Sequence, residues 1–348
     1  MTGRSPVALA VAVAAATLAV LSVSTALRGP FTNRRDRGDV LENPAVSSAS
    51  RGDLGPVLSM GDERNDGGFR ETPFAPLAEL SAALDLAVWQ GSSFGHHLTA
   101  AILFAATALL VGAFTTRWTG CLTAGGAAAG LFAVHPLTSG TASWIAGRSF
   151  VLSGALVAAS LLVGRDPSGT RRGPLRAILS AAIFAFALLS DPRVAPLALV
   201  LALPAVRGAP GSAARGRGVF EAVLFLLPAA ASVLSLVAGP PPAYPRFPAG
   251  VSASLGADLS AIGWAAQSFL VPVHLAPLAD VPVGSAAAVY LAAGGALLAL
   301  ALAAIVRLSA ARPPGPDASL ALVAFAAAGL ALAGQAGSVF PAESRADY

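Results

Sequence analysis

The sequence of 348 residues lacks lysine, contains one cysteine and has only 11% charged residues. The single thiol, Cys121, excludes an internal disulfide and a metal centre built from several cysteines. Soluble domains carry about 25% charged residues, so the low charge and the 55% hydrophobic content predict a polytopic membrane protein. All 22 basic residues are arginine, and they cluster in loops, so nucleic acid is not an expected partner. The lysine-free, alanine-rich composition is typical of a GC-rich bacterial genome.

Apolar runs long enough to cross a bilayer recur along the chain. A transmembrane helix needs about 20 apolar residues, and the runs predict an all-α bundle of about nine such helices with a long first outer loop. The first run has only Arg4 before it and no clear cleavage site after it, so we interpret it as an uncleaved span. The predicted spans are Val7–Leu27, His97–Phe114, Thr119–His135, Ser149–Val163, Pro174–Ser190, Val194–Val206, Val219–Ala238, Ala286–Val306 and Ser319–Gln335.

The arginines also orient this predicted bundle. If the N-terminus is cytoplasmic, the inner loops hold Arg117 and the arginines of residues 165–176, 207–217 and 307–312. This pattern requires Asp258–Pro277 to be a re-entrant or interfacial segment on the outer side. The expected location is therefore the inner (plasma) membrane of a bacterial cell.

One transmembrane domain, residues 1–348, accounts for the whole sequence on this interpretation. Residues 28–93 form its first outer loop, and residues 94–348 supply the remaining spans. Within the loop, Pro76–Trp89 has apolar residues at helical spacing, which predicts an amphipathic helix lying along the outer surface.

Acidic residues follow the first span closely, at Asp36, Asp39 and Glu42. A carboxylate held at the membrane surface can act as a general base on a hydroxyl, or it can bind a divalent cation. The alternative is a solvated loop of mixed charge, because arginines are interleaved with the acids between Arg34 and Arg37.

A second polar group lies between two predicted spans, where His135, Trp144 and Arg148 occur within Leu131–Arg148. Ionisable residues at span ends are candidates for function, and arginine can hold a phosphate through paired hydrogen bonds. Alternatively, Arg148 and Trp144 are interfacial anchors. His135 and His97 are either structural residues at span ends or substrate contacts. No zinc-binding histidine pair or Walker loop is present, so no residue is assigned as a metal ligand, and a divalent cation at the acidic residues of the first outer loop is the one open alternative.

The stretch LFAVHPLTSGTASWIAGRSFVLSGALVAASLL resembles a signature of membrane proteins with a GT-C glycosyltransferase fold. It is most similar to the transmembrane and tetratricopeptide repeat O-mannosyltransferases and their bacterial relatives. The matching residues, in order, are His135, Pro136, Trp144, Ile145, Gly147 and Arg148. Looser similarities follow the family's order along most of the chain, at Asp39–Val46, Phe74–Trp89, Phe94–Leu98, Ala187–Leu201 and Phe340–Tyr348.

The resemblance implies a GT-C-like bundle and an inverting sugar transfer on the outer face. The donor would be a sugar on a polyprenyl phosphate held in the membrane lipid, and the acceptor would be a hydroxyl of a protein or glycan. Asp36 would be the catalytic base, and Asp39 would replace it if the loop shifts. Arg148 and His135 would face the donor phosphate, and Trp144 and His97 complete the expected substrate-binding residues.

The sequence departs from the family pattern at four of its polar positions. Arg35, Ala75, Ala100 and Phe104 stand where the family has aspartate, arginine, asparagine and histidine. The tetratricopeptide repeats are also absent, which suggests a truncated relative or an incomplete gene product. These departures favour an alternative, a catalytically impaired GT-C-like membrane protein that binds a lipid phosphate or a protein partner. Transport would call for acids within spans, where Glu221 is the nearest candidate.

Overall fold

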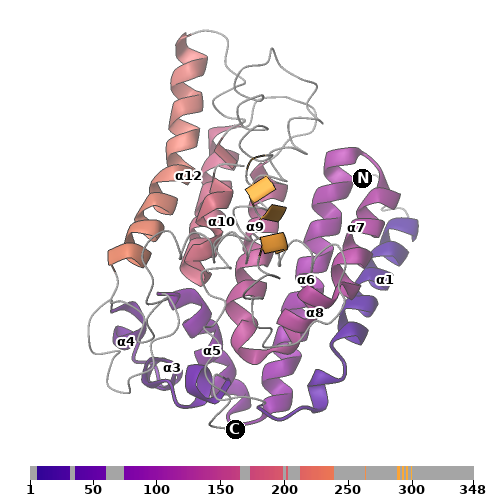
Figure 1. Cartoon of the computed structure of the whole chain (residues 1–348), viewed down its shortest axis with the longest axis vertical. Helices are drawn as coiled ribbons and strands as arrows, with labels where there is room; N and C mark the ends of the chain where they lie inside the picture. The colour runs from indigo at the N-terminus through magenta and orange to yellow at the C-terminus, as the bar shows by residue number, and fades with distance from the viewer. Residues whose placement is uncertain are drawn as a thin grey trace. The chain divides into compact units, whose positions relative to one another are not determined.

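The computed structural model describes residues 6–31, 36–59, 74–164, 173–198, 201–202 and 212–238, with the shorter pieces 263, 288–290, 292–293, 295–296 and 299. Most of these residues are helical, and there is no β-strand among them (Figure 1). The chain forms two units, Met1–Pro192 with Val223–Ala238, and Arg193–Ala222 with Gly239–Tyr348. Most of the predicted spans Ala286–Val306 and Ser319–Gln335, and of the segment Asp258–Pro277, lies outside the described residues.

The first unit contains the apolar helices that the sequence predicts up to residue 190. Pro174–Ser190 has the bounds predicted for it, and the others differ from their predicted bounds by a few residues. The predicted run Val194–Val206 is described only in part, as the 3₁₀ helix η5 (Pro192–Leu197) and the few residues after it. The apolar helices are α1 (Pro6–Ser22), α6 (Ser93–Thr119), α7 (Leu122–Val134), α9 (Arg148–Gly164), α10 (Pro174–Ser190) and α12 (Ser212–Ala238). Residues 212–222 of α12 belong to the second unit and residues 223–238 to the first.

Helix α6 is the centre of the first unit, where it packs against α1, α7 and α9, while α10 packs against α9. Small residues allow the close approach of α6 and α7. A Cβ added to Gly125 would lie 2.6 Å from the carbonyl oxygen of Gly112. Between α9 and α10, the buried hydroxyls of Ser160 and Ser180 each donate to the other residue's carbonyl oxygen, at 2.9 and 2.8 Å. Small residues and interhelical hydrogen bonds of this kind are typical of helix contacts in membranes.

Several of these helices bury small residues and expose large apolar ones. Helix α1 buries Ala15 and Ala19, whereas Leu9 is 66% exposed. Helix α10 buries Ala177 while Leu175 is 76% exposed. A water-soluble monomer rarely leaves broad apolar surface of this kind uncovered.

Two helices are long and apolar enough to cross a membrane, Ser93–Thr119 and the continuous stretch Ile145–Gly164. Pro6–Ser22, Leu122–Val134, Pro174–Ser190 and Val219–Leu234 are apolar but shorter. A buried core helix or a signal sequence can meet the same criteria. The described part of the chain therefore shows two candidate spans, and the predicted bundle of about nine stays a prediction.

The described residues of the segment predicted as the first outer loop fold into helices, most of them short. They gather with the start of α6 at one end of the first unit, below the long helices in Figure 1. The predicted surface helix α5 has the bounds Pro76–Trp89, as expected. The other elements here are η1 (Ala26–Arg28), the π-helical η2 (Arg37–Leu41), α3 (Pro44–Ser50) and α4 (Gly55–Leu58), with α8 (Pro136–Ser143) and η4 (Ile145–Gly147) from the later sequence.

A small apolar core orders this end of the unit. It joins Val40, Val46, Ala82 and Ala83 to Ile145 of η4, which is 1% exposed. The Asn43 side chain caps α3 by accepting hydrogen bonds from the backbone N–H groups of Ala45 and Val46. The asparagine–proline pair thus begins a helix, because proline is well suited to a first helical position.

The two faces of α5 differ from those of an ordinary amphipathic surface helix. Asp85 is only 4% exposed, whereas Leu84 beside it is 65% exposed and Val88 is 60% exposed. The helix therefore turns an acidic residue inward and apolar residues outward. A charged residue is rarely buried without a partner, so the inward face of α5 indicates a polar site.

Candidate functional site

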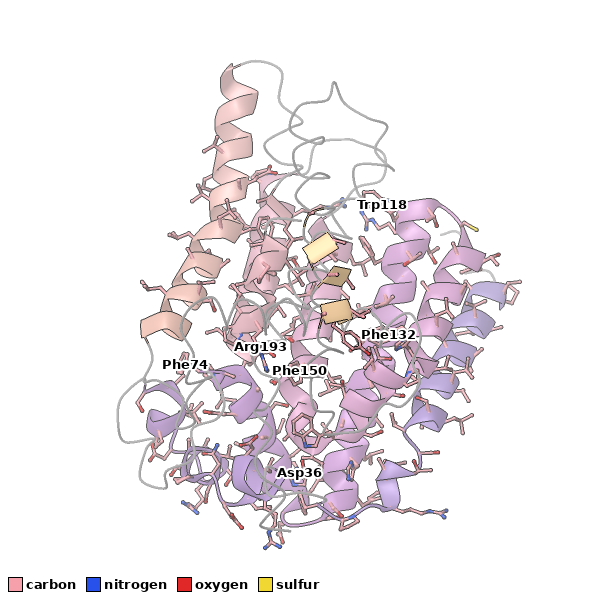
Figure 2. All side chains as sticks on the ribbon, viewed as in Figure 1. Asp36, Phe74, Trp118, Phe132, Phe150 and Arg193 are labelled. Carbon is pink, nitrogen blue, oxygen red and sulfur yellow. The ribbon has the colours of Figure 1, made fainter. Side chains whose placement is uncertain are left out.

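Five buried polar side chains form a cluster at this end of the first unit. They are Asp36 and Asp85, His96 and His97, and Arg148, each at most 4% exposed. We call them the buried polar cluster. Figure 2 shows Asp36 at the end where α5 and the short helices of the loop lie. The five residues come from four places in the sequence, namely residue 36 just before η2, α5, the start of α6 and the start of α9.

Arg148, the first residue of α9, forms a buried ion pair with Asp85 of α5. The same nitrogen, Nη2, also donates to the carbonyl oxygen of His96 at 3.4 Å. The other terminal nitrogen, Nη1, donates to the carbonyl oxygen and to the hydroxyl of Ser81, at 3.3 and 3.2 Å. A guanidinium has five N–H donors, and these four contacts engage both of its terminal nitrogens.

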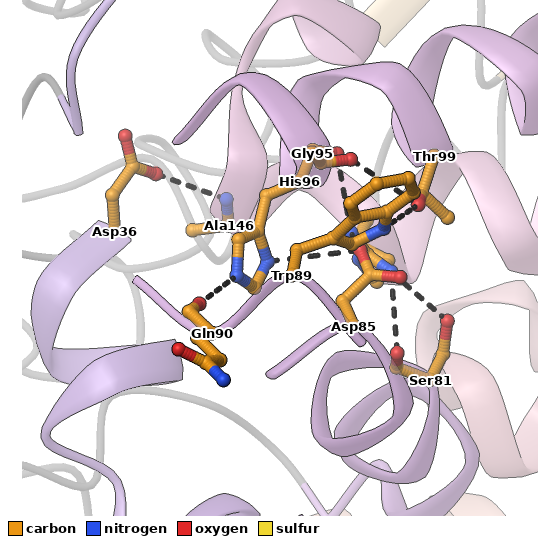
Figure 3. Close-up of polar contacts among 10 residues, drawn as sticks. Asp36, Ser81, Asp85, Trp89, Gln90, Gly95, His96, Thr99 and Ala146 are labelled. Atoms are coloured by element: carbon orange, nitrogen blue, oxygen red, sulfur yellow. Dashed lines mark hydrogen bonds and ion pairs between the residues drawn. The ribbon is translucent and has the colours of Figure 1, made fainter. Parts of the chain in front are cut away.

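His96 connects the ion pair to the turn between α5 and α6. Its Nε2 lies 3.0 Å from the carbonyl oxygen of Gln90, and its Nδ1 lies 3.6 Å from Asp85 Oδ2 (Figure 3). Phe31 packs edge-on against the imidazole, with ring centroids 5.5 Å apart. Because a carbonyl oxygen only accepts, the contact with Gln90 places a ring proton on Nε2.

Asp36 is fully buried, and its Oδ1 accepts a hydrogen bond from the backbone N–H of Ala146 at 3.0 Å. Figure 3 shows the carboxylate directed toward Ala146. The carboxylate also interacts electrostatically with the buried imidazole of His97. Among the described residues, neither ring nitrogen of His97 has a hydrogen-bond partner. The electrostatics of His97 also include an interaction with the backbone of Pro30, so within the described residues a buried carboxylate lies close to a buried imidazole at the start of α6.

The structure brings together three of the six residues that the sequence nominated, Asp36, His97 and Arg148. Asp39 lies in η2, half-buried, outside the buried polar cluster. Half-buried His135 is the N-cap of α8, and its Nδ1 accepts from the backbone N–H of Leu137 at 3.2 Å.

Trp144, also half-buried, joins α8 to η4. It stands at the start of the turn that carries Ala146 and Arg148. The tryptophan therefore begins the turn whose Ala146 N–H binds Asp36. Its role in substrate binding stays a prediction.

Three residues of the site are not among the six nominated ones, namely Ser81, Asp85 and His96, although His96 adjoins the nominated His97 at the same predicted span start. One signal was available, because Ser81 and Asp85 are four positions apart and so share one face of a helix. The sequence alone assigns that polar face to solvent, as for any surface helix. Only the packing of α5 against α6 and α9 turns it inward.

The described residues hold no group of three or more histidine, cysteine, aspartate or glutamate side chains placed to bind a metal ion. The sequence allows a divalent cation at Asp36 and Asp39, but these two acids do not belong to a set of metal ligands within this part of the chain. No protein-family model, curated protein or solved structure matches the chain.

Proposed function

We propose that this protein is a GT-C-like membrane glycosyltransferase that transfers a sugar from a polyprenyl-phosphate donor to a hydroxyl of a protein or glycan, with inversion. One observation carries the proposal. Asp36, the predicted base in the first outer loop, is fully buried against Ala146, inside the block that most resembles the GT-C signature. Two segments 110 residues apart, each nominated for the same reaction, meet at one hydrogen bond.

Placement in a bacterial plasma membrane, with the site on the outer side, is part of this proposal. Large apolar residues exposed on α1 and α10 suit contact with lipid. Helix α6 has 27 residues, which gives a length of about 40 Å, enough to cross a bilayer. It begins near His96 and His97 of the buried polar cluster and carries Arg117 in its last turn. In the orientation that we propose, the arginine lies on the cytoplasmic side and the site lies outside, in agreement with the preference of arginine for the cytoplasmic ends of spans.

The proposed reaction needs one base and one leaving group. The acceptor hydroxyl attacks the anomeric carbon of the donor, and its proton passes to the carboxylate of Asp36. A new carbon–oxygen bond forms as the bond between that carbon and the phosphate oxygen breaks, which inverts the anomeric centre and releases polyprenyl phosphate. A positioned carboxylate contributes about 10²–10⁴-fold to such a step.

A second candidate is a protein that keeps the fold and binds a lipid phosphate or a partner without catalysing transfer. The contacts of Arg148 favour the partner-binding form of this candidate, because both terminal nitrogens of the guanidinium already bind acceptors within the protein and are not directed at a phosphate. Arg35 in the place of a second acid supports the same candidate.

A transfer assay separates the two candidates. Purified protein in lipid vesicles is given polyprenyl-phosphate-linked hexoses and hydroxyl acceptors, and the release of polyprenyl phosphate is measured. Asp36→Asn keeps the oxygen that accepts from Ala146 but cannot take a proton, so turnover should fall by about 10²-fold or more. Asp53→Asn is the matched control, because Asp53 is an exposed acid of the same loop. Full activity of Asp36→Asn would contradict the proposed base, and no turnover with any donor would favour the second candidate.

A further inference from the structure

We infer that Asp85 is a positioning residue, which acts through Arg148 to fix the turn whose Ala146 N–H holds Asp36. The inference rests on the proposed function and deepens it. It assigns Arg148 to the support of the catalytic carboxylate rather than to the donor phosphate. Two contacts joined by a short backbone stretch form the path: the ion pair of Asp85 with Arg148, the backbone from Arg148 back to Ala146, and the hydrogen bond from Ala146 to Asp36.

The first step is the direction of the Arg148 side chain. Its terminal nitrogens bind Asp85, both oxygens of Ser81 and the carbonyl of His96, so the guanidinium is held against α5 and the start of α6. A bidentate grip on a phosphate needs two N–H groups directed at the same ligand. In Arg148 the terminal groups are directed at protein acceptors, and the side chain is only 4% exposed.

The second step is the rigidity of η4, the single turn between Trp144 and Arg148. Ile145 anchors the first residue of this turn in the small apolar core that it shares with Val40 and Val46. Gly147 closes the turn by donating its N–H to the carbonyl of Trp144 at 3.0 Å. A Cβ on Gly147 would lie 2.5 Å from the carbonyl oxygen of Thr141, so this backbone also packs closely against the end of α8. With Arg148 tied to α5, the turn is held on both sides of Ala146.

The third step is what that turn provides to Asp36. A hydrogen bond from a backbone N–H to a carboxylate is stronger than one between neutral groups and has a defined direction. The bond from Ala146 therefore sets where the Asp36 carboxylate lies relative to a bound hydroxyl. Catalysis by a positioned group is sensitive to displacement, and an error of 1 Å can cost about 100-fold in rate. Loosening the turn should lower the rate without weakening donor binding.

Two measurements on the reconstituted full chain test the inference. The first gives kcat and the KM for the polyprenyl-phosphate donor. The second is hydrogen exchange of the peptide that contains Ile145–Gly147, recorded without donor. Asp85→Asn should lower kcat by about 100-fold, leave the donor KM within about twofold, and speed exchange in this peptide by about fivefold or more. Glu79→Gln is the matched control, an acid of the same helix outside the buried polar cluster, and it should change neither measurement.

A milder variant keeps the test decisive if Asp85→Asn does not fold. Ser81→Ala removes one acceptor of Arg148 and leaves the ion pair in place, so kcat and exchange should change in the same direction by a few-fold. A raised donor KM with unchanged kcat in either variant would overturn the inference, because it would show that Arg148 serves the phosphate. Unchanged exchange in Ile145–Gly147 would overturn it too. If the wild type shows no turnover, the proposed function fails, and the exchange measurement still decides whether Asp85 supports the turn.

Discussion

The buried ion pair between Asp85 and Arg148 predicts a stability pattern that no exposed ion pair would give. Both side chains are almost completely buried, at 5% and 4% exposure. Removing one partner, by Asp85→Leu or Arg148→Met, leaves the other charge buried without compensation. Each single substitution should therefore lower the free energy of unfolding by about 3–5 kcal/mol. The double substitution removes both charges and keeps apolar groups in their place, so it should be more stable than either single variant.

The magnitude of the coupling follows from these figures. Suppose that each single substitution lowers the free energy of unfolding by at least about 3 kcal/mol, and that the double substitution lowers it by no more than that. The coupling free energy between the two side chains is then about 3 kcal/mol or more. Equilibrium unfolding in mixed micelles, followed by the helical circular dichroism signal, measures all four proteins. Glu42→Gln is the control, because its ion pair with Arg37 is about two-thirds exposed (64% and 63%) and should contribute little. The reasoning would be refuted if the double variant lost as much free energy of unfolding as the two single variants together.

Four further predictions concern packing, thiol reactivity, topology and capping. Gly125→Ala should cost about 1–3 kcal/mol in unfolding experiments, because its Cβ would lie 2.6 Å from a carbonyl oxygen of α6; an unchanged stability would show that α6 and α7 can separate freely. The pKa of the exposed Cys121 thiol is lowered by a hydrogen bond from the backbone of Ala124, so it should react with maleimides at a lower pH than free cysteine does. In intact cells an impermeant maleimide should miss Cys121 but label Ser92→Cys in a Cys121→Ser background, and the opposite pattern would reverse the proposed topology. Asn43→Ala should destabilise α3 by about 1 kcal/mol, seen as faster hydrogen exchange confined to that helix.

Local signals in the sequence were sufficient for several elements of the fold. The bounds of α5 and α10 agree with the predicted ones, and Pro76 and Pro174 account for the starts of these helices because proline suits a first helical position. Helix α3 was missed, although Asn43 and Pro44 carry the usual signal of a helix start. Its seven residues are too few to show a helical repeat of apolar positions.

The candidate site was predictable in part. Asp36 and Arg148 were selected from residue type, position relative to the spans and resemblance, and the structure places both in the buried polar cluster. The partner of Arg148 was not predictable, because an acid on an amphipathic helix is ordinarily a solvated residue. His135 illustrates the opposite case, in which a residue nominated for chemistry serves as a helix cap.

The sequence by itself determined the helical content, the apolar character of the helices and the places where proline begins them, because these depend on residues close together in the chain. Only the tertiary structure decided which way α5 turns Asp85, which acid pairs with Arg148, and whether Asp36 faces solvent or protein. Those contacts join residues 63 and 110 positions apart. They depend on how the helices pack, and no local pattern encodes that packing.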